Sequence, residues 1–127
     1  MPEFISVHTQ HESEPRRSSG VTAGGFTFAT VTALDPATGR RAERAGTVSE
    51  EVGLLFERVD EILGRAKLGR EDLVKATCWI SDEEHRFDVI YAYRDQCVEG
   101  VYPQRITMSA GLPADCRCAI EFIAAAR

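Results

Sequence analysis

The 127-residue sequence contains no run of the roughly 20 apolar residues that a membrane helix needs. Its N-terminal stretch, MPEFISVHTQHESEPRR, lacks the apolar segment of a secretory signal. We therefore expect a cytoplasmic protein without a membrane partner. Basic residues are also few, because 15 Lys and Arg stand against 20 Asp and Glu and leave a net charge of −5. This balance lacks the basic footprint of a nucleic-acid-binding protein, so no nucleic-acid partner is expected.

Cysteine is scarce, and no C-x-x-C pair occurs among the four cysteines at positions 78, 97, 116 and 118. In a chain without a leader, reduced thiols are favoured over two disulfides. Cys116 and Cys118 alone would form an incomplete zinc site, so no metal is expected. The sequence also contains no G-x-S-x-G, Walker loop or H-E-x-x-H motif, which leaves the common hydrolase, nucleotide and metalloprotease sites without a signature.

What is present is ordinary globular composition, 43% hydrophobic and 28% charged, in a length that suits a single domain over residues 1–127. Alternating aromatic and β-branched residues predict a strand over 25–34. The sequence Thr47-Val-Ser-Glu50 fits a capping box before a helix that runs through residue 66. Further patterns predict strands at 74–80, 104–109 and 116–125. A second helix is predicted at roughly 82–98, with its apolar stripe formed by Phe87, Ile90, Tyr91, Arg94 and Val98.

This order of elements predicts an α+β domain in which two helices pack on one face of a sheet. The partly continuous apolar run from Cys116 to Ala125 indicates a final strand buried on both faces. A chain of this length has nothing left to cover the second face of the sheet. We therefore expect oligomerisation through that face. Residues 9–20 are polar and predict a loop, with His8 and His11 at its edge as solvated surface residues.

Three residues attract attention before any family is considered. Arg105 follows Pro103 at the start of a predicted strand, where its five-donor fork would suit a carboxylate or phosphate. From spacing alone, a surface arginine in a structural salt bridge is the favoured interpretation. Glu121 lies inside an apolar strand, so it is either paired or at a solvated edge. Asp88 lies on the second helix, where a solvated face is the simpler interpretation.

Three segments together resemble the RidA/YjgF family of small reactive-intermediate deaminases. They are Leu34-Asp-Pro-Ala-Thr-Gly39 after a strand, Leu73-Val-Lys-Ala-Thr-Cys-Trp-Ile80, and Tyr102-Pro-Gln-Arg105 followed by Leu112-Pro and the ending Ile-Glu-Phe-Ile-Ala. The resemblance covers roughly residues 20–125, and residues 1–20 form a divergent N-terminal segment.

The resemblance implies a chorismate-mutase-like fold and a homotrimer whose sheets surround a central barrel, with sites at the subunit interfaces. It implies hydrolysis of small enamines and imines of the 2-aminoacrylate or 2-iminopropionate type to a 2-keto acid and ammonia, without metal or organic cofactor. The family arginine that pairs with the substrate carboxylate corresponds to Arg105.

The sequence departs from the family at several positions. Where the family has Ser-Gly, this chain has Ala29-Thr30, the helix asparagine is Asp88, and a common cysteine is Thr107. The glutamate assigned to water activation corresponds to Ala119. Glu121 matches a second family glutamate, ~6.5–7 Å further along the strand, and cannot simply take its place.

The carboxylate-binding half of the site is therefore retained and the water-activating half is replaced. Asp88, Thr107 and Asp115 are candidate catalytic replacements, while Thr30, Tyr91, Glu121 and Cys116 are candidates for contacting a small carboxylate-bearing metabolite. Three functions stay open. They are an imine/enamine deaminase, a pathway-specific tautomerase or deaminase acting on another small carboxylate, and a non-catalytic trimeric metabolite-binding protein.

Overall fold

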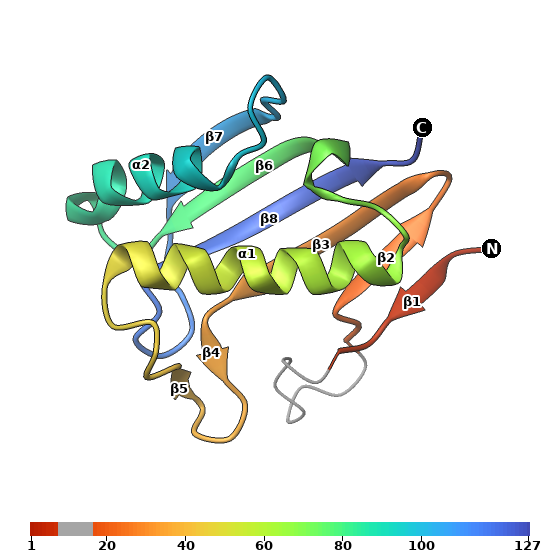
Figure 1. The fold of residues 1–127 in the computed structure, drawn as a ribbon. Helices are drawn as coiled ribbons and strands as arrows, with labels where there is room; N and C mark the ends of the chain where they lie inside the picture. The colour runs from red at the N-terminus through yellow and green to blue at the C-terminus, as the bar shows by residue number, and fades with distance from the viewer. Residues whose placement is uncertain (8–16) are drawn as a thin grey trace.

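The computed structural model describes residues 1–7 and 17–127. The predicted sheet and the two predicted helices are both present. A sheet of six strands forms one layer, and two helices, α1 (Val48–Arg65) and α2 (Arg86–Gln96), lie side by side on one of its faces (Figure 1). The predicted α+β class, with a mixed sheet and two helices on one face, is thereby confirmed. No helix in the described ranges is long and apolar enough to cross a bilayer.

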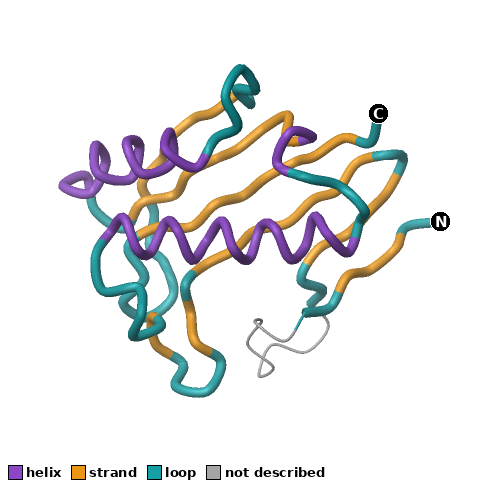
Figure 2. The backbone as a smooth tube through the Cα atoms, viewed as in Figure 1, coloured by secondary structure: helices purple, strands orange, loops and turns teal. Residues whose placement is uncertain are grey.

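The sheet has the strand order β1-β2-β3-β8-β6-β7. Its strands are β1 (Glu3–Ile5), β2 (Gly20–Ala23), β3 (Phe26–Thr32), β6 (Leu73–Ile80), β7 (Gln104–Ser109) and β8 (Cys118–Ala125). Every neighbouring pair is antiparallel except β6 and β7, which makes the sheet mixed. A separate short ribbon joins β4 (Leu34–Asp35) and β5 (Arg40–Arg41) around the predicted Asp-Pro turn (Figure 2).

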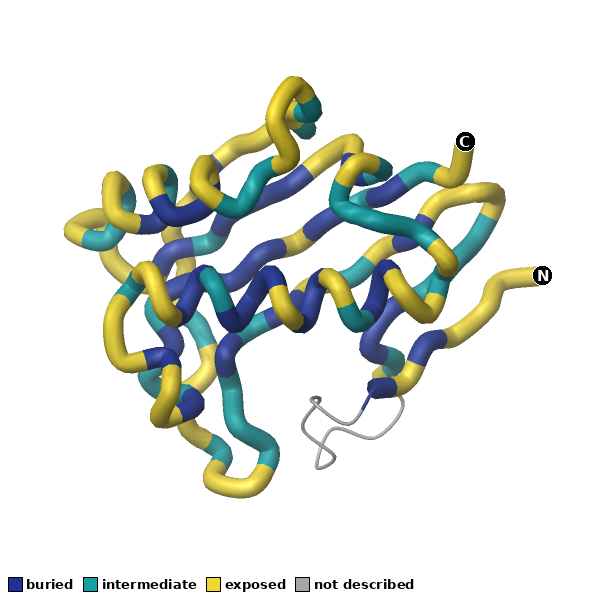
Figure 3. The backbone as a smooth tube through the Cα atoms, viewed as in Figure 1, coloured by how far each residue is buried: buried dark blue, intermediate teal, exposed yellow. Residues whose placement is uncertain are grey.

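The capping box before α1 is confirmed. Glu50 N–H donates to Thr47 Oγ1 and Thr47 N–H donates to Glu50 Oε1, both at 3.0 Å. The apolar stripe of α1 packs on the helix side of β3 and β8, where alternate strand residues are buried (Figure 3). The core of these two elements consists of Val52, Leu55, Phe56, Val59, Ile62, Leu63, Val31, Ile120 and Phe122.

The second helix differs from its prediction. A short 3-10 turn, η2 (Glu83–His85), precedes it, so the α-helix begins at Arg86 rather than near 82. The buried face consists of Val89, Ala92 and Tyr93, and the predicted apolar stripe was wrong, because Phe87 and Tyr91 are 66% and 51% exposed. The helix carries apolar and aromatic residues all around its circumference, so periodicity alone did not identify the side facing α1.

The sheet face opposite the helices, called here the open face, carries exposed apolar side chains. Phe26 and Phe28 on β3 and Ile106 and Met108 on β7 are each more than 40% exposed. On β8 this face includes Ala119, which is buried, and Glu121, which is exposed. Glu121 is therefore exposed within a single chain, and burial of β8 on both faces stays a prediction for the assembly. The polar segment 9–20 and His8 and His11 lie mostly outside the described residues, and β2 begins at Gly20.

A buried ion pair joins α1 to the start of β8. Glu51 on α1 is fully buried, and its carboxylate accepts from Arg117 Nε at 2.7 Å and from the backbone N–H groups of Arg117 and Cys118 at 2.8 and 3.2 Å. Arg117 also donates to the carbonyl oxygens of Ala45 and Gly46. One carboxylate thus ties the first turn of α1 to the start of β8.

Substituting Glu51→Gln should lower the free energy of unfolding by about 3–5 kcal/mol, because it leaves the Arg117 guanidinium partly buried without its counter-charge. Glu57→Gln on the same helix is the matched control, since Glu57 pairs with Arg44 on the surface and its loss should change stability by at most about 1 kcal/mol. Urea unfolding measures both. Equal small effects would show that the Glu51 pair is dispensable.

Candidate functional site

Arg105 lies on the edge strand β7, on the side of the sheet that faces the helices. Its register partner on β6 is Ala76, which is buried beneath the helices, so the Arg105 side chain leans toward α2. It borders a hollow of about 390 Å³, called here the Arg105 hollow. The other lining residues are Ile90, Tyr93, Arg94, Cys97, Tyr102 and Pro103.

Two contacts orient the Arg105 guanidinium. Its Nη1 donates to Thr107 Oγ1 at 2.7 Å, and its Cζ lies 5.6 Å from the centroid of the Tyr93 ring. No carboxylate among residues 1–7 and 17–127 lies within ion-pairing distance of it, so the expected salt bridge is not formed there. An exposed guanidinium held by neutral groups keeps donors for an external anion.

The walls of the Arg105 hollow carry two groups that burial keeps neutral. Burial raises the pKa of the Tyr93 phenol and of the Cys97 thiol. The Tyr93 hydroxyl is buried and has no hydrogen-bond partner among the described residues. Arg105 therefore provides the positive charge beside neutral neighbours, an arrangement that favours an anionic ligand group.

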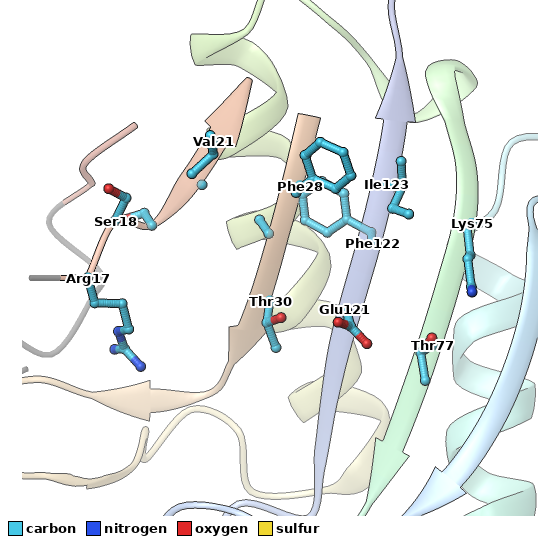
Figure 4. A pocket seen from close by; sticks show the side chains of 13 residues that line it. Arg17, Ser18, Val21, Phe28, Thr30, Lys75, Thr77, Glu121, Phe122 and Ile123 are labelled. Carbon is cyan, nitrogen blue, oxygen red and sulfur yellow. The ribbon is translucent and has the colours of Figure 1, made fainter. Parts of the chain in front are cut away.

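A second group of candidates lies on the open face. Thr30 on β3, Glu121 on β8 and Thr77 on β6 are register partners and form one row across three strands, with the helices behind the strands (Figure 4). Trp79 Nε1 donates to Glu121 Oε1 at 3.4 Å, so the carboxylate is partnered on a solvated surface. This row borders a hollow of about 390 Å³.

Next to this row, the open face has a further hollow of about 350 Å³, called here the Ala119 hollow. Thr30, Thr32, Trp79 and Ala119 form its floor, and residues 110–113 form one wall. On the family resemblance, Ala119 corresponds to the glutamate that is expected to activate water. The missing side chain therefore falls at a cavity and not at a packed surface.

The remaining candidates lie elsewhere. Asp88 and Tyr91 are on the exposed outer surface of α2 and border a different hollow, shared with the first turn of α1. Cys116 is only 2% exposed, and burial raises the pKa of its thiol. Asp115 pairs with Arg40 and Arg41 and accepts from Arg41 N–H, a backbone hydrogen bond that lowers the pKa of this carboxyl. Asp115 thus holds β5 in place.

The structure brings Arg105 together with Thr107, and Thr30 together with Glu121, but it does not bring these two pairs together. Arg105 and Glu121 are on opposite faces of the same sheet. A site containing both pairs would need side chains from a second copy of the chain. Within the described ranges, no three His, Cys, Asp or Glu side chains cluster so as to hold a metal ion.

The family model described as Endoribonuclease L-PSP matches residues 10–126. The chain belongs to this family. A RutC family protein of Aquifex aeolicus is 33% identical over 110 residues, which cover 84% of this chain and 86% of that protein. The resemblance to the RidA/YjgF family is thereby confirmed.

Solved structures of this family share the fold. A Rid-family protein from Yersinia pestis superposes with a TM-score of 0.85 at 21% identity, over 98% of this chain and 99% of the other. A YjgF-family protein from Neisseria meningitidis reaches 0.81 at 18% identity, over 100% and 96%. At these identities the likeness shows the fold alone.

Sequence reasoning missed several residues that border the hollows of this L-PSP family chain. Tyr93 and Cys97 lie beside Arg105, and Trp79 borders the Ala119 hollow. Arg58 on α1 also borders the Ala119 hollow. Only the spatial convergence of α1 with the end of β3 reveals this arginine, because it is distant in sequence from every motif.

The four free thiols should differ sharply in reactivity. Cys78, Cys116 and Cys118 are at most 2% exposed, and burial raises the pKa of Cys78 to about 11, whereas Cys97 is partly exposed in the Arg105 hollow. Native-state alkylation followed by mass spectrometry should modify Cys97 first, and Cys97→Ser should remove that reaction. Equally fast labelling of the other three in folded protein would contradict the arrangement.

Proposed function

We propose that this protein hydrolyses small enamines and imines of the 2-aminoacrylate or 2-iminopropionate type, with Arg105 holding the substrate carboxylate. One observation carries the proposal. Arg105 faces a hollow, is oriented by Thr107 and Tyr93, and has no carboxylate partner among the described residues. A guanidinium in this state binds a carboxylate by two parallel, charge-assisted hydrogen bonds. Membership of the family supports the reaction class.

The reaction needs little more than orientation. An enamine first tautomerises to the imine, and water then adds to the C=N carbon to form a carbon–oxygen bond while the nitrogen gains a proton. The hydroxyl proton of this adduct moves to the nitrogen as the C–N bond breaks, which releases ammonia and leaves the carbonyl group of the 2-keto acid. Arg105 fixes the carboxylate next to the reacting carbon, and effective concentration supplies much of the rate. Thr107 acts through Arg105 by holding its guanidinium.

The assembly in this proposal is a homotrimer in the cytoplasm. The exposed apolar side chains on the open face support assembly through it, namely Phe26 and Phe28 on β3 and Ile106 and Met108 on β7. Assembly through this face would bring Thr30 and Glu121 of one copy near another copy, in line with a site formed at the interface. Tyr91 and Cys116 also stay proposed substrate contacts, although neither borders the Arg105 hollow.

A diverged substrate is the second candidate, and Ala119 favours it. The alanine leaves a hollow where the family has a carboxylate, so this chain would accept a differently shaped carboxylate in a tautomerase or deaminase reaction. A net charge of −5 disfavours the ribonuclease activity that the family description names.

Arg105→Ala should abolish ammonia and pyruvate release from 2-aminoacrylate generated in situ by a serine dehydratase, and should change the free energy of unfolding by less than about 1 kcal/mol, because the residue is exposed. Arg65→Ala, an exposed arginine at the end of α1, is the control and should retain full activity. Acceleration that survives Arg105→Ala would overturn the proposal. A folded wild type that binds carboxylates without turnover would indicate a binding protein instead.

Asp88→Asn tests whether a carboxylate on α2 activates the water. We expect kcat/KM to change less than threefold, because Asp88 borders a different hollow of the chain from Arg105. A large loss of kcat with unchanged substrate affinity would instead assign Asp88 as the base, contributed across a subunit interface.

Phe28→Asp and Ile106→Asp should each convert the assembly to monomers, because each replaces an exposed apolar side chain of the open face with a charge. Phe87→Asp is the matched control, since Phe87 is 66% exposed on the outer surface of α2. Sedimentation velocity distinguishes the states. An unchanged trimer in both open-face variants would move the interface elsewhere.

A further inference from the structure

Cys97 borders the Arg105 hollow at the point where α2 ends. It is partly exposed, whereas Cys78, Cys116 and Cys118 are at most 2% exposed. The folded chain therefore presents one accessible nucleophilic sulfur, and this sulfur shares a hollow with Arg105. Any reactant that Arg105 binds would lie next to the Cys97 thiol.

Tyr93 lies beside this sulfur and is only 5% exposed. Its hydroxyl has no hydrogen-bond partner among the described residues, but it is near enough to Cys97 to lower the pKa of that thiol. A buried hydroxyl without a partner is costly, and an ionised sulfur would accept a hydrogen bond from it. The Tyr93 hydroxyl thus favours the thiolate, which is the reactive form of cysteine.

Two arginines act on Cys97 in the same direction. Burial raises the pKa of the Cys97 thiol, and the Tyr93 hydroxyl, Arg105 and Arg70 each oppose that rise. Arg70 is paired with Asp60, whereas Arg105 has no carboxylate partner among the described residues. Arg105 is therefore the cation that stays available to a negatively charged reactant beside the sulfur.

The described lining of the Arg105 hollow favours a reactant with negative charge. It contains Arg94 and Arg105 but neither an aspartate nor a glutamate. Arg94 lies 3.7 Å from its neighbour Asp95, which is not part of the lining, so Arg105 supplies the uncompensated charge. The whole protein carries a net charge of −5 and should repel anions on average. A preference of Cys97 for an anionic reactant would therefore come from this hollow.

We propose that Cys97 is a site of reversible exchange with small disulfides that carry carboxylate groups, with Arg105 binding the carboxylate. The Cys97 thiol first loses its proton to water, and the thiolate attacks one sulfur of the disulfide. An S–S bond forms between Cys97 and that half of the reactant. The original S–S bond breaks, and the other half leaves as a thiolate that is then protonated. Cys97 is thereby oxidised and the disulfide reduced, so no further oxidant is needed.

The adduct has two consequences. Burial raises the pKa of Cys97, so its thiolate is a poor leaving group and an external thiol restores free Cys97 slowly. The attached carboxylate would also occupy the Arg105 guanidinium and exclude a substrate carboxylate. This second consequence rests on the proposed deaminase function, whereas the modification itself does not.

The test compares two reagents of the same shape on the full-length protein, 3,3′-dithiodipropionate and its neutral diamide. The ratio of their rate constants at Cys97, followed by mass spectrometry, is divided by the same ratio for the neutral thiol N-acetylcysteinamide. At low ionic strength we expect this normalised ratio to favour the carboxylate by about fivefold, and to approach one in about 0.5 M salt. A ratio of one or less at low salt would overturn the proposal. An internal disulfide between Cys97 and Cys78 in place of the adduct would also overturn it.

Four variants locate the effect. Cys97→Ser should remove the modification, and Arg105→Ala should bring the normalised ratio to about one while Cys97 still reacts with the diamide. Arg65→Ala, at the exposed end of α1, is the control and should keep the wild-type ratio. Tyr93→Phe keeps the ring beside Arg105, so it should slow both reagents alike and leave the ratio unchanged. A wild-type ratio in Arg105→Ala would overturn recognition by Arg105.

An activity measurement separates this inference from the deaminase proposal. Turnover of 2-aminoacrylate should fall in parallel with the fraction of Cys97 modified and return after treatment with dithiothreitol, and Cys97→Ser should lose this sensitivity to the reagent. Full activity of the fully modified protein would overturn the blocking of Arg105. A wild type without turnover would overturn the deaminase proposal alone, since the mass measurement still decides whether Cys97 is the modification site.

Discussion

The insertion of the C-terminal strand β8 between β3 and β6 is the constraint on which the rest of the structure depends. Without it, β3 and β6 have no common partner and the sheet divides into two parts. The antiparallel registers of β8 place Glu121 between Thr30 and Thr77, and Ala119 between Thr32 and Trp79. The open-face residues of β8 thus determine which side chains are neighbours there. The residues on its other face, Ile120 and Phe122, pack in the core beneath α1.

The arginines of this chain differ in whether a carboxylate pairs with them. Arg117, Arg70 and Arg86 each have a carboxylate partner, and these pairs join elements or cap turns. Arg105 is oriented only by the Thr107 hydroxyl and the Tyr93 ring, and it borders a hollow. An oriented cation without a counter-charge is poised for an external anion, because the fold already holds its geometry.

Arg105 and Ala119 lie on opposite faces of one sheet, because alternate residues of a strand point to opposite faces. Arg105 and Thr107 face the helix layer, whereas Ala119 and Glu121 lie on the open face. No hollow among those described here contains both Arg105 and Glu121.

Local sequence determined much of this protein. The capping box at Thr47 and the apolar period of α1 follow from contacts within a few residues, and alternation along β3 and β7 follows from strand geometry, so these elements were predictable. The family resemblance around Tyr102-Pro-Gln-Arg105 singled out Arg105 as the candidate carboxylate-binding residue. Only the tertiary structure decided which face of α2 is buried, that Arg105 and Glu121 lie on opposite sides, and that Arg58 reaches the Ala119 hollow. These depend on contacts between residues far apart in the chain, and no local period encodes such contacts.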